Sequence, residues 1–439
     1  MLVLLMFSSV LTFSVFFGLS WFFYMFIFLL FHPVFFFFNF SSSFLMKNTY
    51  LGLDTFSFLM IILTFWIIFL SIFSSMSFIN FLYAGFFLFM MTSLMNILFL
   101  FFLVSNFFFF FFFFESSLIP TLFIIIGLGN KIERLSSGLY LFFYTIFSSM
   151  PMLMSIFYFF YLNDTLSFFL LDLSNFFYLV YIVLIFSFLV KMPMFLVHSW
   201  LPKAHVEAPV SGSMVLAGVL LKMGGYGIFR LSFIFKYYLK FNSFWIYISV
   251  WGGILSSLIC MRQVDLKSLI AFSSVSHMSM VIMGILIYSD LGVYGCFMLM
   301  IAHGLCSSGL FFLANVVYER SGTRSIFLNK GLLSIYPSLS LWWFVLCSFN
   351  MAAPPSLNLI SEIFLINSVV SWSFYLVFFL MFLCFLSGAY NLFLFTFSNH
   401  GKVFSNIFFF NSCFFREFFI LYLHSFPIFF MFLKLDLFY

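Results

Sequence analysis

The chain has 439 residues, of which 65% are hydrophobic and only 7% are charged, and its formal net charge is +5 at pH 7. A soluble domain carries about 25% charged residues, so this composition excludes a globular surface exposed to water. Continuous apolar stretches, such as residues 51–70, also exclude the alternating pattern of a transmembrane barrel. The chain is therefore expected to lie mostly in lipid.

Charges and turn residues divide the chain into apolar stretches, most of them about as long as the roughly 20 residues that cross a bilayer. We therefore predict an all-α, polytopic membrane protein with about 14 transmembrane helices. No charge precedes His32, so neither a signal peptide nor an Arg-rich transit peptide is expected. The first 38 residues can form one long helix or two, and two are preferred. The expected spans are 2–16, 17–38, 54–75, 79–103, 106–127, 138–160, 176–197, 211–233, 243–260, 266–288, 292–314, 333–370, 373–396 and 410–433.

Two of these spans contain prolines that interrupt a helix. Pro193 follows Lys191 in one span, and Pro354 and Pro355 precede Glu362 in another. Proline removes a backbone donor and displaces the carbonyl four residues earlier, here that of Leu189 in the first break. At membrane depth such a carbonyl needs protein or water beside it. Interrupted helices in the two halves of a transporter mark its transport path.

Four charged side chains stand out inside the predicted spans: Glu115, Lys191, Lys222 and Glu362. A charged residue at the bilayer centre costs roughly 2.5–3.5 kcal/mol on insertion scales, so each requires a reason. A lysine removed from water releases its proton more readily, and a nearby carboxylate opposes that release. Movement of Glu115 relative to Lys191 would thus switch the lysine between holding and releasing a proton. A static ion pair that locks two helices is the alternative.

Histidines add intermediate proton carriers. His277 lies among serines whose hydroxyls can hold water, and His303 stands between Ala302 and Gly304. Histidine can accept or release a proton near neutral pH, although a lone membrane histidine can also simply bridge helices. His32, His400 and His424 are expected near the membrane interface.

Basic residues favour alternate loops of the predicted topology. Loops that contain residues such as Lys131, Lys203, Arg262, Arg320 and Arg416 hold ten of the basic residues, against three in the intervening loops. The first set is therefore expected on the matrix or cytoplasmic side.

The six cysteines are scattered and form no C-x-x-C pair, and the chain contains neither a G-x-G-x-x-G nor a Walker loop. We therefore expect no redox cofactor or nucleotide in this chain. The run of phenylalanines at 107–114 is attributed to compositional drift rather than to a site.

Several motifs occur in order between about residues 105 and 420 and resemble chain 4 of mitochondrial NADH–ubiquinone oxidoreductase (complex I). Ser361 stands where that family usually has Gly, and Ser199 where it often has Leu. Residues 1–100 resemble the family only in hydropathy and in Leu51–Asp54. The motifs that carry the resemblance are Phe114–Pro120, Val190–Met214, Leu220–Gly227, Leu258–Lys267, Ile301–Gly304 and Ala353–Leu359.

The resemblance implies an antiporter-like subunit with two inverted five-helix repeats and two interrupted helices. It implies N-terminal helices at 1–103, repeats at 104–233 and 243–396, and a C-terminal helix at 397–439. It also implies that Glu115 and Lys191 form an acid–base pair and that Lys222 is the central proton carrier. His277 and His303 would then continue the polar series to Glu362, which would face the next subunit.

The leading interpretation is a subunit that moves protons across the mitochondrial inner membrane while NADH reduces ubiquinone. NAD, FMN, iron–sulfur clusters and ubiquinone would be bound by partner subunits, and the partners would be other membrane-arm subunits and membrane lipids, with no nucleic acid. A stand-alone cation/proton antiporter is the alternative, although a sodium site would need more buried carboxylates. A b-type cytochrome is disfavoured, because His198 and His205 flank prolines instead of forming pairs on facing helices.

Overall fold

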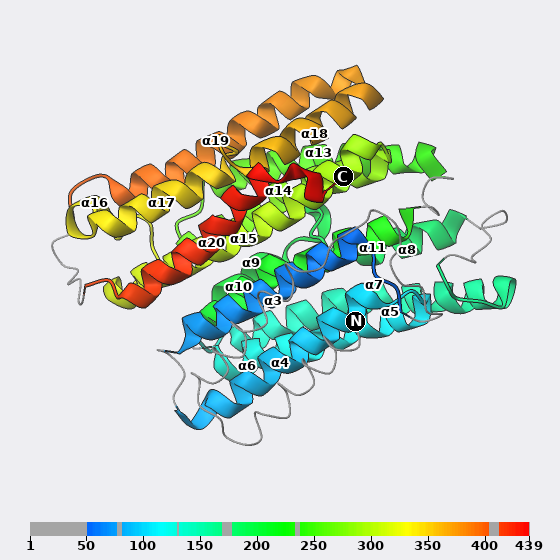
Figure 1. Ribbon diagram of the computed structural model, residues 1–439, viewed down its shortest axis with the longest axis horizontal. Helices are drawn as coiled ribbons and strands as arrows, with labels where there is room; N and C mark the ends of the chain where they lie inside the picture. The colour runs from blue at the N-terminus through cyan, green and yellow to red at the C-terminus, as the bar shows by residue number, and fades with distance from the viewer. Residues whose placement is uncertain are drawn as a thin grey trace. The chain divides into compact units, whose positions relative to one another are not determined.

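A computed structural model describes residues 51–76, 81–129, 131–168, 178–232, 238–403 and 412–438. These residues form helices joined by short connections, and among them there is no β-strand, only three isolated β-bridges. Figure 1 shows the long helices running roughly along one another within each part of the chain. The spans expected at 2–16 and 17–38 lie outside the described residues.

Ten helical spans of the described residues are long and apolar enough to cross a membrane. Two shorter apolar helices, α8 (Tyr178–Lys191) and α18 (Leu357–Trp372), lie at the predicted proline breaks. The chain is thus a multi-pass membrane protein. The ten long spans are Thr55–Ser75, Tyr83–Leu103, Phe107–Leu128, Arg134–Asn163, Val210–Arg230, Leu239–Cys260, Leu266–Ile287, Asp290–Ser321, Phe374–Asn399 and Phe415–Leu433.

The described chain divides into two compact units, each taken here by itself. The first unit ends at Leu184 and also includes Glu207–Val215. Within it α4 packs on α3 and α6, α7 packs on α6, and α10 packs on α3. Its helices are α3 (Thr55–Ser75), α4 (Phe81–Leu103), α5 (Phe107–Ser116), α6 (Leu118–Leu128), α7 (Arg134–Asn163), the first half of α8, and α10 (Val210–Val215).

The second unit comprises Ile185–Val206 and Leu216–Tyr439, as far as these residues are described. Its helix α15 (Asp290–Ser321) packs against α14, α17, α18 and α20 and is buried along its spanning window. The other elements are the end of α8, η1 (Phe195–Val197), α9 (Trp200–Glu207), η2 (Leu216–Leu220), α11 (Leu221–Arg230), α13 (Leu239–Cys260), α14 (Leu266–Ile287), α16 (Leu332–Ile335), α17 (Pro337–Asn350), α18, η4 (Phe374–Leu376), α19 (Val377–Asn399), α20 (Phe415–Leu433) and η5 (Leu435–Leu437).

Local signals set the ends of the central helix α15. The Ser289 hydroxyl accepts a hydrogen bond from the Gly292 amide at 3.1 Å, which caps the first turn. The helix ends at Gly322, whose φ of 69° is accessible to glycine at little cost. The expected end at 314 is wrong by about two turns, because the helix continues with Asn315, Val316, Val317 and Arg320 still buried.

Most buried serines and threonines of the spans donate to a carbonyl three or four residues earlier in their own helix. Ser273 donates to Ile270 at 2.7 Å, and Ser274 donates to Ala271 at 2.6 Å. In hydrocarbon an unbonded hydroxyl is costly, so this local bond makes a hydroxyl tolerable inside a spanning helix.

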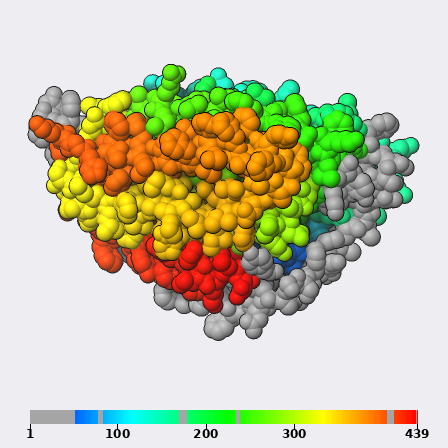
Figure 2. Space-filling model, turned by 90° about the horizontal axis from the view of Figure 1, so that it is seen from above, coloured from blue at the N-terminus to red at the C-terminus, as the bar shows by residue number. Residues whose placement is uncertain are grey.

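Aromatic side chains cover much of the outer surface of the helices. In Figure 2, α17 (yellow), α19 (orange) and α20 (red) lie side by side on one face. Phe378 and Phe385 on α19 are 62% and 73% exposed, as expected for side chains that meet lipid.

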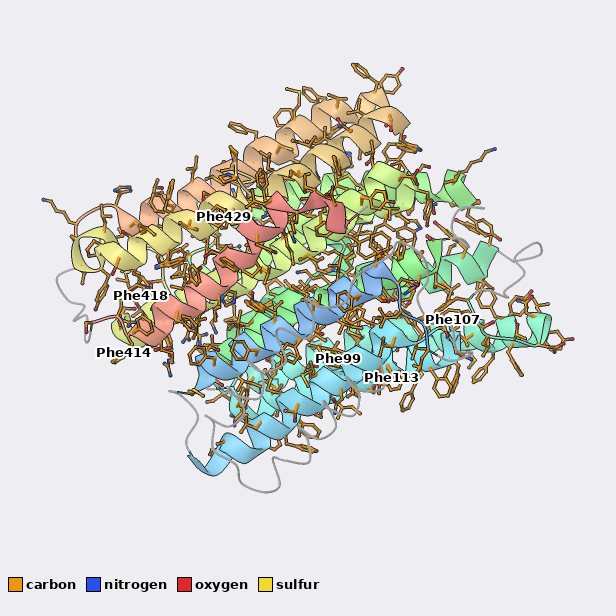
Figure 3. The ribbon with its side chains drawn as sticks, viewed as in Figure 1. Phe99, Phe107, Phe113, Phe414, Phe418 and Phe429 are labelled. Atoms are coloured by element: carbon orange, nitrogen blue, oxygen red, sulfur yellow. The ribbon has the colours of Figure 1, made fainter. Side chains whose placement is uncertain are left out.

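The phenylalanine run forms part of an ordinary helix. In α5 the side chains of Phe107, Phe110 and Phe114 are buried, whereas Phe109 and Phe112 are exposed. Figure 3 shows Phe99 of α4 and Phe107 and Phe113 of α5 among the side chains of the first unit. The buried residues recur every three or four positions, which is the spacing of one helical face.

Basic loops of the second unit gather at one end. A β-bridge joins Asp265 to Ser325 between two of these loops. Nearby, the Arg324 guanidinium donates to the Val206 carbonyl at 2.7 Å, and Arg320 pairs with Glu417 at 2.5 Å. Four of the loops expected on the same side of the membrane are therefore in contact.

Candidate functional site

Lys222 lies in a span that changes its helical type just before the lysine. One turn of π-helix, η2, separates α10 from α11, and the ammonium group donates to the Ala217 carbonyl in that turn at 2.5 Å. The side chain has no exposed surface. π-turns are uncommon and frequently occur at functional sites.

His303 on α15 is the next group along. Its Nδ1 lies 3.3 Å from the Lys222 Nζ, within reach of a hydrogen bond, and its ring is fully buried. The ring centroid of His277 on α14 is 5.0 Å from that of His303. Two helices that pack on each other thus present their histidines side by side.

Glu362 ends this series. Its Oε1 lies 3.9 Å from the His277 Nδ1, and the two side chains are 13% and 3% exposed. That distance is too long for a direct hydrogen bond, so a proton transfer between them requires a small movement or an intervening water. Four side chains expected to carry protons therefore stand in one series: Lys222, His303, His277 and Glu362.

Tyr390 on α19 contacts this series, although it was not predicted from the sequence. Its hydroxyl lies 2.9 Å from the His277 Nε2 and 3.1 Å from the Ser276 Oγ, and the side chain is fully buried. A usable signal existed, because Tyr390 and Asn391 interrupt an apolar span and a buried tyrosine hydroxyl usually has a partner.

The first proline break lies directly after Lys191, the last residue of α8. A protein group satisfies the Leu189 carbonyl that the proline displaces, since the Met194 amide donates to it at 3.1 Å. In addition, the indole of Trp200 donates to the Val190 carbonyl at 3.0 Å. Protein groups thus satisfy the backbone that Pro193 leaves open.

The second break separates α17 from α18. The helix ends at Asn350, four residues before the first proline, and the Asn358 amide donates to the Phe349 carbonyl at 2.6 Å. The Asn350 amide donates to the Asn391 Oδ1 at 2.9 Å. Polar side chains therefore surround the break, as expected for irregular backbone at membrane depth.

The pairing of Glu115 with Lys191 stays a prediction. Glu115 lies in the first unit, one residue before the end of α5, and Lys191 lies in the second. The expected span 106–127 is divided here, because Ser117 separates α5 from α6. Lys191 is almost completely buried at the end of α8.

The remaining histidines take other roles. His424 is not interfacial, since it is fully buried in the middle of α20 and its Nδ1 bonds the Ile420 carbonyl at 2.8 Å. His205 stacks on Phe311 with ring centroids 4.5 Å apart. In the described part of the chain, no three His, Cys, Asp or Glu side chains gather as metal ligands.

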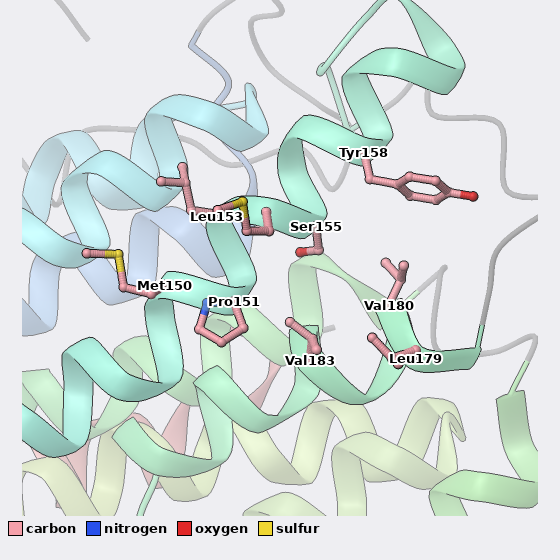
Figure 4. Close-up of a pocket in the computed structure, with 9 residues that line it drawn as sticks. Met150, Pro151, Leu153, Ser155, Tyr158, Leu179, Val180 and Val183 are labelled. Atoms are coloured by element: carbon pink, nitrogen blue, oxygen red, sulfur yellow. The ribbon is translucent and has the colours of Figure 1, made fainter.

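A groove of about 600 Å³ lies elsewhere, in the first unit between α7 and α8 (Figure 4). Pro151, Leu179 and Val183 contribute to its lining, and Ser155 and Tyr158 are the polar members. The groove contains no ionisable acid or base near neutral pH. It is suited to hydrocarbon rather than to proton transfer.

Comparison with known sequences assigns the chain to a family. Residues 1–101 match the family described as NADH-ubiquinone oxidoreductase chain 4, amino terminus, and residues 104–387 match NADH:quinone oxidoreductase/Mrp antiporter, TM. The chain is 58% identical over 317 residues to NADH-ubiquinone oxidoreductase chain 4 of Aedes aegypti, an alignment that covers 72% of this chain and 71% of the relative. For the Locusta migratoria protein of the same name the identity is 51%, over 74% of each chain.

The chain belongs to the NADH-ubiquinone oxidoreductase chain 4 family.

Solved structures agree with this family's antiporter-like fold. A chain of respiratory complex I from Thermus thermophilus with bound NADH superposes with a TM-score of 0.84 at 22% identity, covering 97% of this chain and 94% of that one. A chain of the Mrp complex from Dietzia sp. gives 0.73 at 18% identity, covering 81% and 68%. At these identities the likeness concerns the fold alone.

Proposed function

We propose that this chain-4-family protein is a proton-translocating subunit of respiratory complex I in the mitochondrial inner membrane. Partner subunits of the membrane arm surround it and, together with the redox subunits, couple NADH oxidation by ubiquinone to its proton transfer. The observation that carries the proposal is the buried series from Lys222 through His303 and His277 to Glu362. Buried ionisable groups in spanning helices typically mark ion or proton paths.

Each member of the series can hold a proton and pass it on. Lys222 releases a proton toward the His303 Nδ1, and the imidazole carries it toward His277. Glu362 accepts it as a carboxylate and releases it beyond the series. Glu115 and Lys191 are proposed to supply the preceding acid–base pair.

We further propose that the chain itself holds no flavin, haem or iron–sulfur cluster, which the partner subunits supply. The scattered cysteines and the lack of a nucleotide-binding loop support this. Spectroscopy or metal analysis that found a metal bound by Cys260, Cys306, His277 or His303 would contradict it.

The decisive variant is Glu362→Gln, which keeps the shape of the side chain and removes its charge. In the assembled complex, NADH oxidation by an artificial acceptor should continue, since that reaction uses only the redox subunits. Proton pumping and coupled ubiquinone reduction should fall sharply, because transport of one charge against 100 mV requires about 2.3 kcal/mol and the series has lost its last carrier.

The matched control is Glu133→Gln, which removes the same charge from an exposed position next to α7. It should pump normally. An assembled Glu362→Gln complex that pumps at the normal rate would reduce Glu362 to a structural role.

The alternative function is stand-alone cation/proton antiport. The similarity in fold to a chain of the Mrp complex is consistent with it. Purification decides between the two. A complex I subunit should purify with partner subunits whose coupled NADH oxidation requires it, whereas an antiporter should exchange ions in vesicles without NADH.

A further inference from the structure

The polar series has a side branch that ends on the backbone of α14. The Ser276 Oγ donates to the Ser273 carbonyl at 2.8 Å, so the single hydroxyl hydrogen of Ser276 is committed. The 3.1 Å contact between Ser276 and Tyr390 is therefore a hydrogen bond only if Tyr390 donates.

The same count fixes the contact with His277. A tyrosine hydroxyl has one hydrogen, and when that hydrogen points to Ser276 the oxygen can only accept from the His277 Nε2, 2.9 Å away. The bonds then run in one direction, from His277 to Tyr390, to Ser276 and to the Ser273 carbonyl.

The opposite arrangement uses one bond fewer. If Tyr390 donates to the Nε2, the contact with the Ser276 Oγ holds no hydrogen. His277, Tyr390, Ser276 and Ser273 are all buried. Two buried polar atoms in contact with no hydrogen between them cost free energy. The directed arrangement is thus the more stable one.

We propose that Tyr390, through Ser276, keeps a proton on the Nε2 of His277 and thereby reserves the Nδ1 for proton exchange with Glu362. This inference rests on the proposed function. Tyr390 is a positioning residue, because it touches the proton-carrying imidazole without lying between His277 and Glu362.

The proton step then balances. Doubly protonated His277 gives the hydrogen of its Nδ1 to the Glu362 carboxylate, so one N–H bond breaks and one O–H bond forms. The products are a neutral imidazole that still carries its Nε2 hydrogen and a neutral carboxylic acid. The ring does not have to rotate before the next proton arrives at the Nδ1.

The first test variant is Tyr390→Phe in the whole assembled complex, which keeps the ring and removes the hydroxyl. Infrared difference spectra or nitrogen-15 resonances of labelled histidine distinguish the two neutral tautomers of His277. Loss of one hydrogen bond should shift their ratio by about five- to tenfold toward the Nδ1-protonated form. Proton pumping should slow by a similar factor.

Variants of Ser276, alone and combined with Tyr390→Phe, test whether Ser276 acts through Tyr390. Ser276→Ala should shift the tautomer in the same direction but less, and it should have no further effect in the Tyr390→Phe background, because it acts through Tyr390. Ser276→Thr keeps the hydroxyl and should restore the wild-type ratio. Ser274→Ala is the matched control, since that buried hydroxyl bonds only the Ala271 carbonyl of the same helix.

An unchanged tautomer in Tyr390→Phe, or equal effects of Ser274→Ala and Ser276→Ala, would overturn the inference. Proton pumping by the Glu362→Gln variant, measured in parallel, tests the proposed function separately. If it stops pumping while Tyr390→Phe leaves the tautomer unchanged, only the inference fails. If the tautomer shifts as expected but Glu362→Gln pumps normally, the assignment of the bonds stands and the proton series fails.

Discussion

The proposed role of Lys222 requires a side chain that can carry a positive charge and can also lose it by releasing a proton. Its ammonium group contacts the His303 imidazole and the Ala217 carbonyl, and neither neighbour carries a formal negative charge. A purely structural lysine could be replaced by another cation, whereas a proton carrier could not. This difference can be measured.

We predict that Lys222→Arg stops proton pumping in complexes that assemble, because a guanidinium keeps its proton at all accessible pH values. Lys240→Arg, at an exposed position of α13, is the control and should pump normally. Assembly is followed on native gels and pumping in sealed vesicles. Normal pumping by Lys222→Arg would show that only the positive charge matters.

Sequence reasoning found Lys222, His277, His303 and Glu362 because a charge or an imidazole inside an apolar stretch is visible in one dimension. It missed Tyr390, since the polar pair Tyr390–Asn391 in an apolar span shows only that a partner is needed, and the partner comes from another helix. The misplacement of His424 has the same origin. Burial there depends on how α20 packs against α15, which no local pattern records.

Among the helices, α11 approaches the end of α8 closely at Gly224, two residues after Lys222. A Cβ added to Gly224 would lie 2.8 Å from the Met192 Cβ and 2.9 Å from the Phe188 carbonyl oxygen. Backbone atoms cannot retreat as a flexible side chain can. The absence of a side chain at Gly224 therefore lets the lysine helix and the proline break lie against each other.

We predict that Gly224→Ala destabilises the protein by about 1–3 kcal/mol through overpacking, and that it lowers the temperature at which the detergent-solubilised complex dissociates. Gly388→Ala is the matched control, because no atom lies within 4 Å of a Cβ built on that mid-helix glycine. It should assemble and dissociate like the wild type. Equal behaviour of the two variants would contradict the close approach.

The helices themselves were largely predictable. Expected spans such as 54–75, 266–288 and 410–433 correspond to α3, α14 and α20, within five residues at each end. Both proline interruptions were also found. The π-turn η2 was not, since the sequence around it contains no residue that excludes an ordinary helix and its geometry depends on packing.

At the scale of the whole molecule, the orientation in the membrane can be tested with a thiol that the protein already carries. Cys413 lies outside the spanning helices, just before α20, and is partly exposed. Burial raises the pKa of this thiol, while the charge of Arg320 acts in the opposite direction. Less thiolate is therefore present at neutral pH than for an ordinary cysteine.

We predict that an impermeant maleimide labels Cys413 only from the matrix side, where the basic loops are expected. The rate should be slow at pH 7 and should still rise above about pH 8.5, the ordinary thiol range, because the thiolate is the reactive species. Cys413→Ser should abolish this labelling. Labelling from the opposite side alone would invert the proposed topology.

The π-turn at Leu216–Leu220 also sets the direction in which the side chains after it point around the helix axis. A π-turn amounts to one residue inserted into an α-helix, and each residue advances an α-helix by roughly 100°. Removal of a single residue from this turn would restore ordinary winding and swing the Lys222 side chain by about that angle around the helix axis, away from His303. This stretch is thus expected to tolerate a change in the identity of its residues more readily than a change in their number.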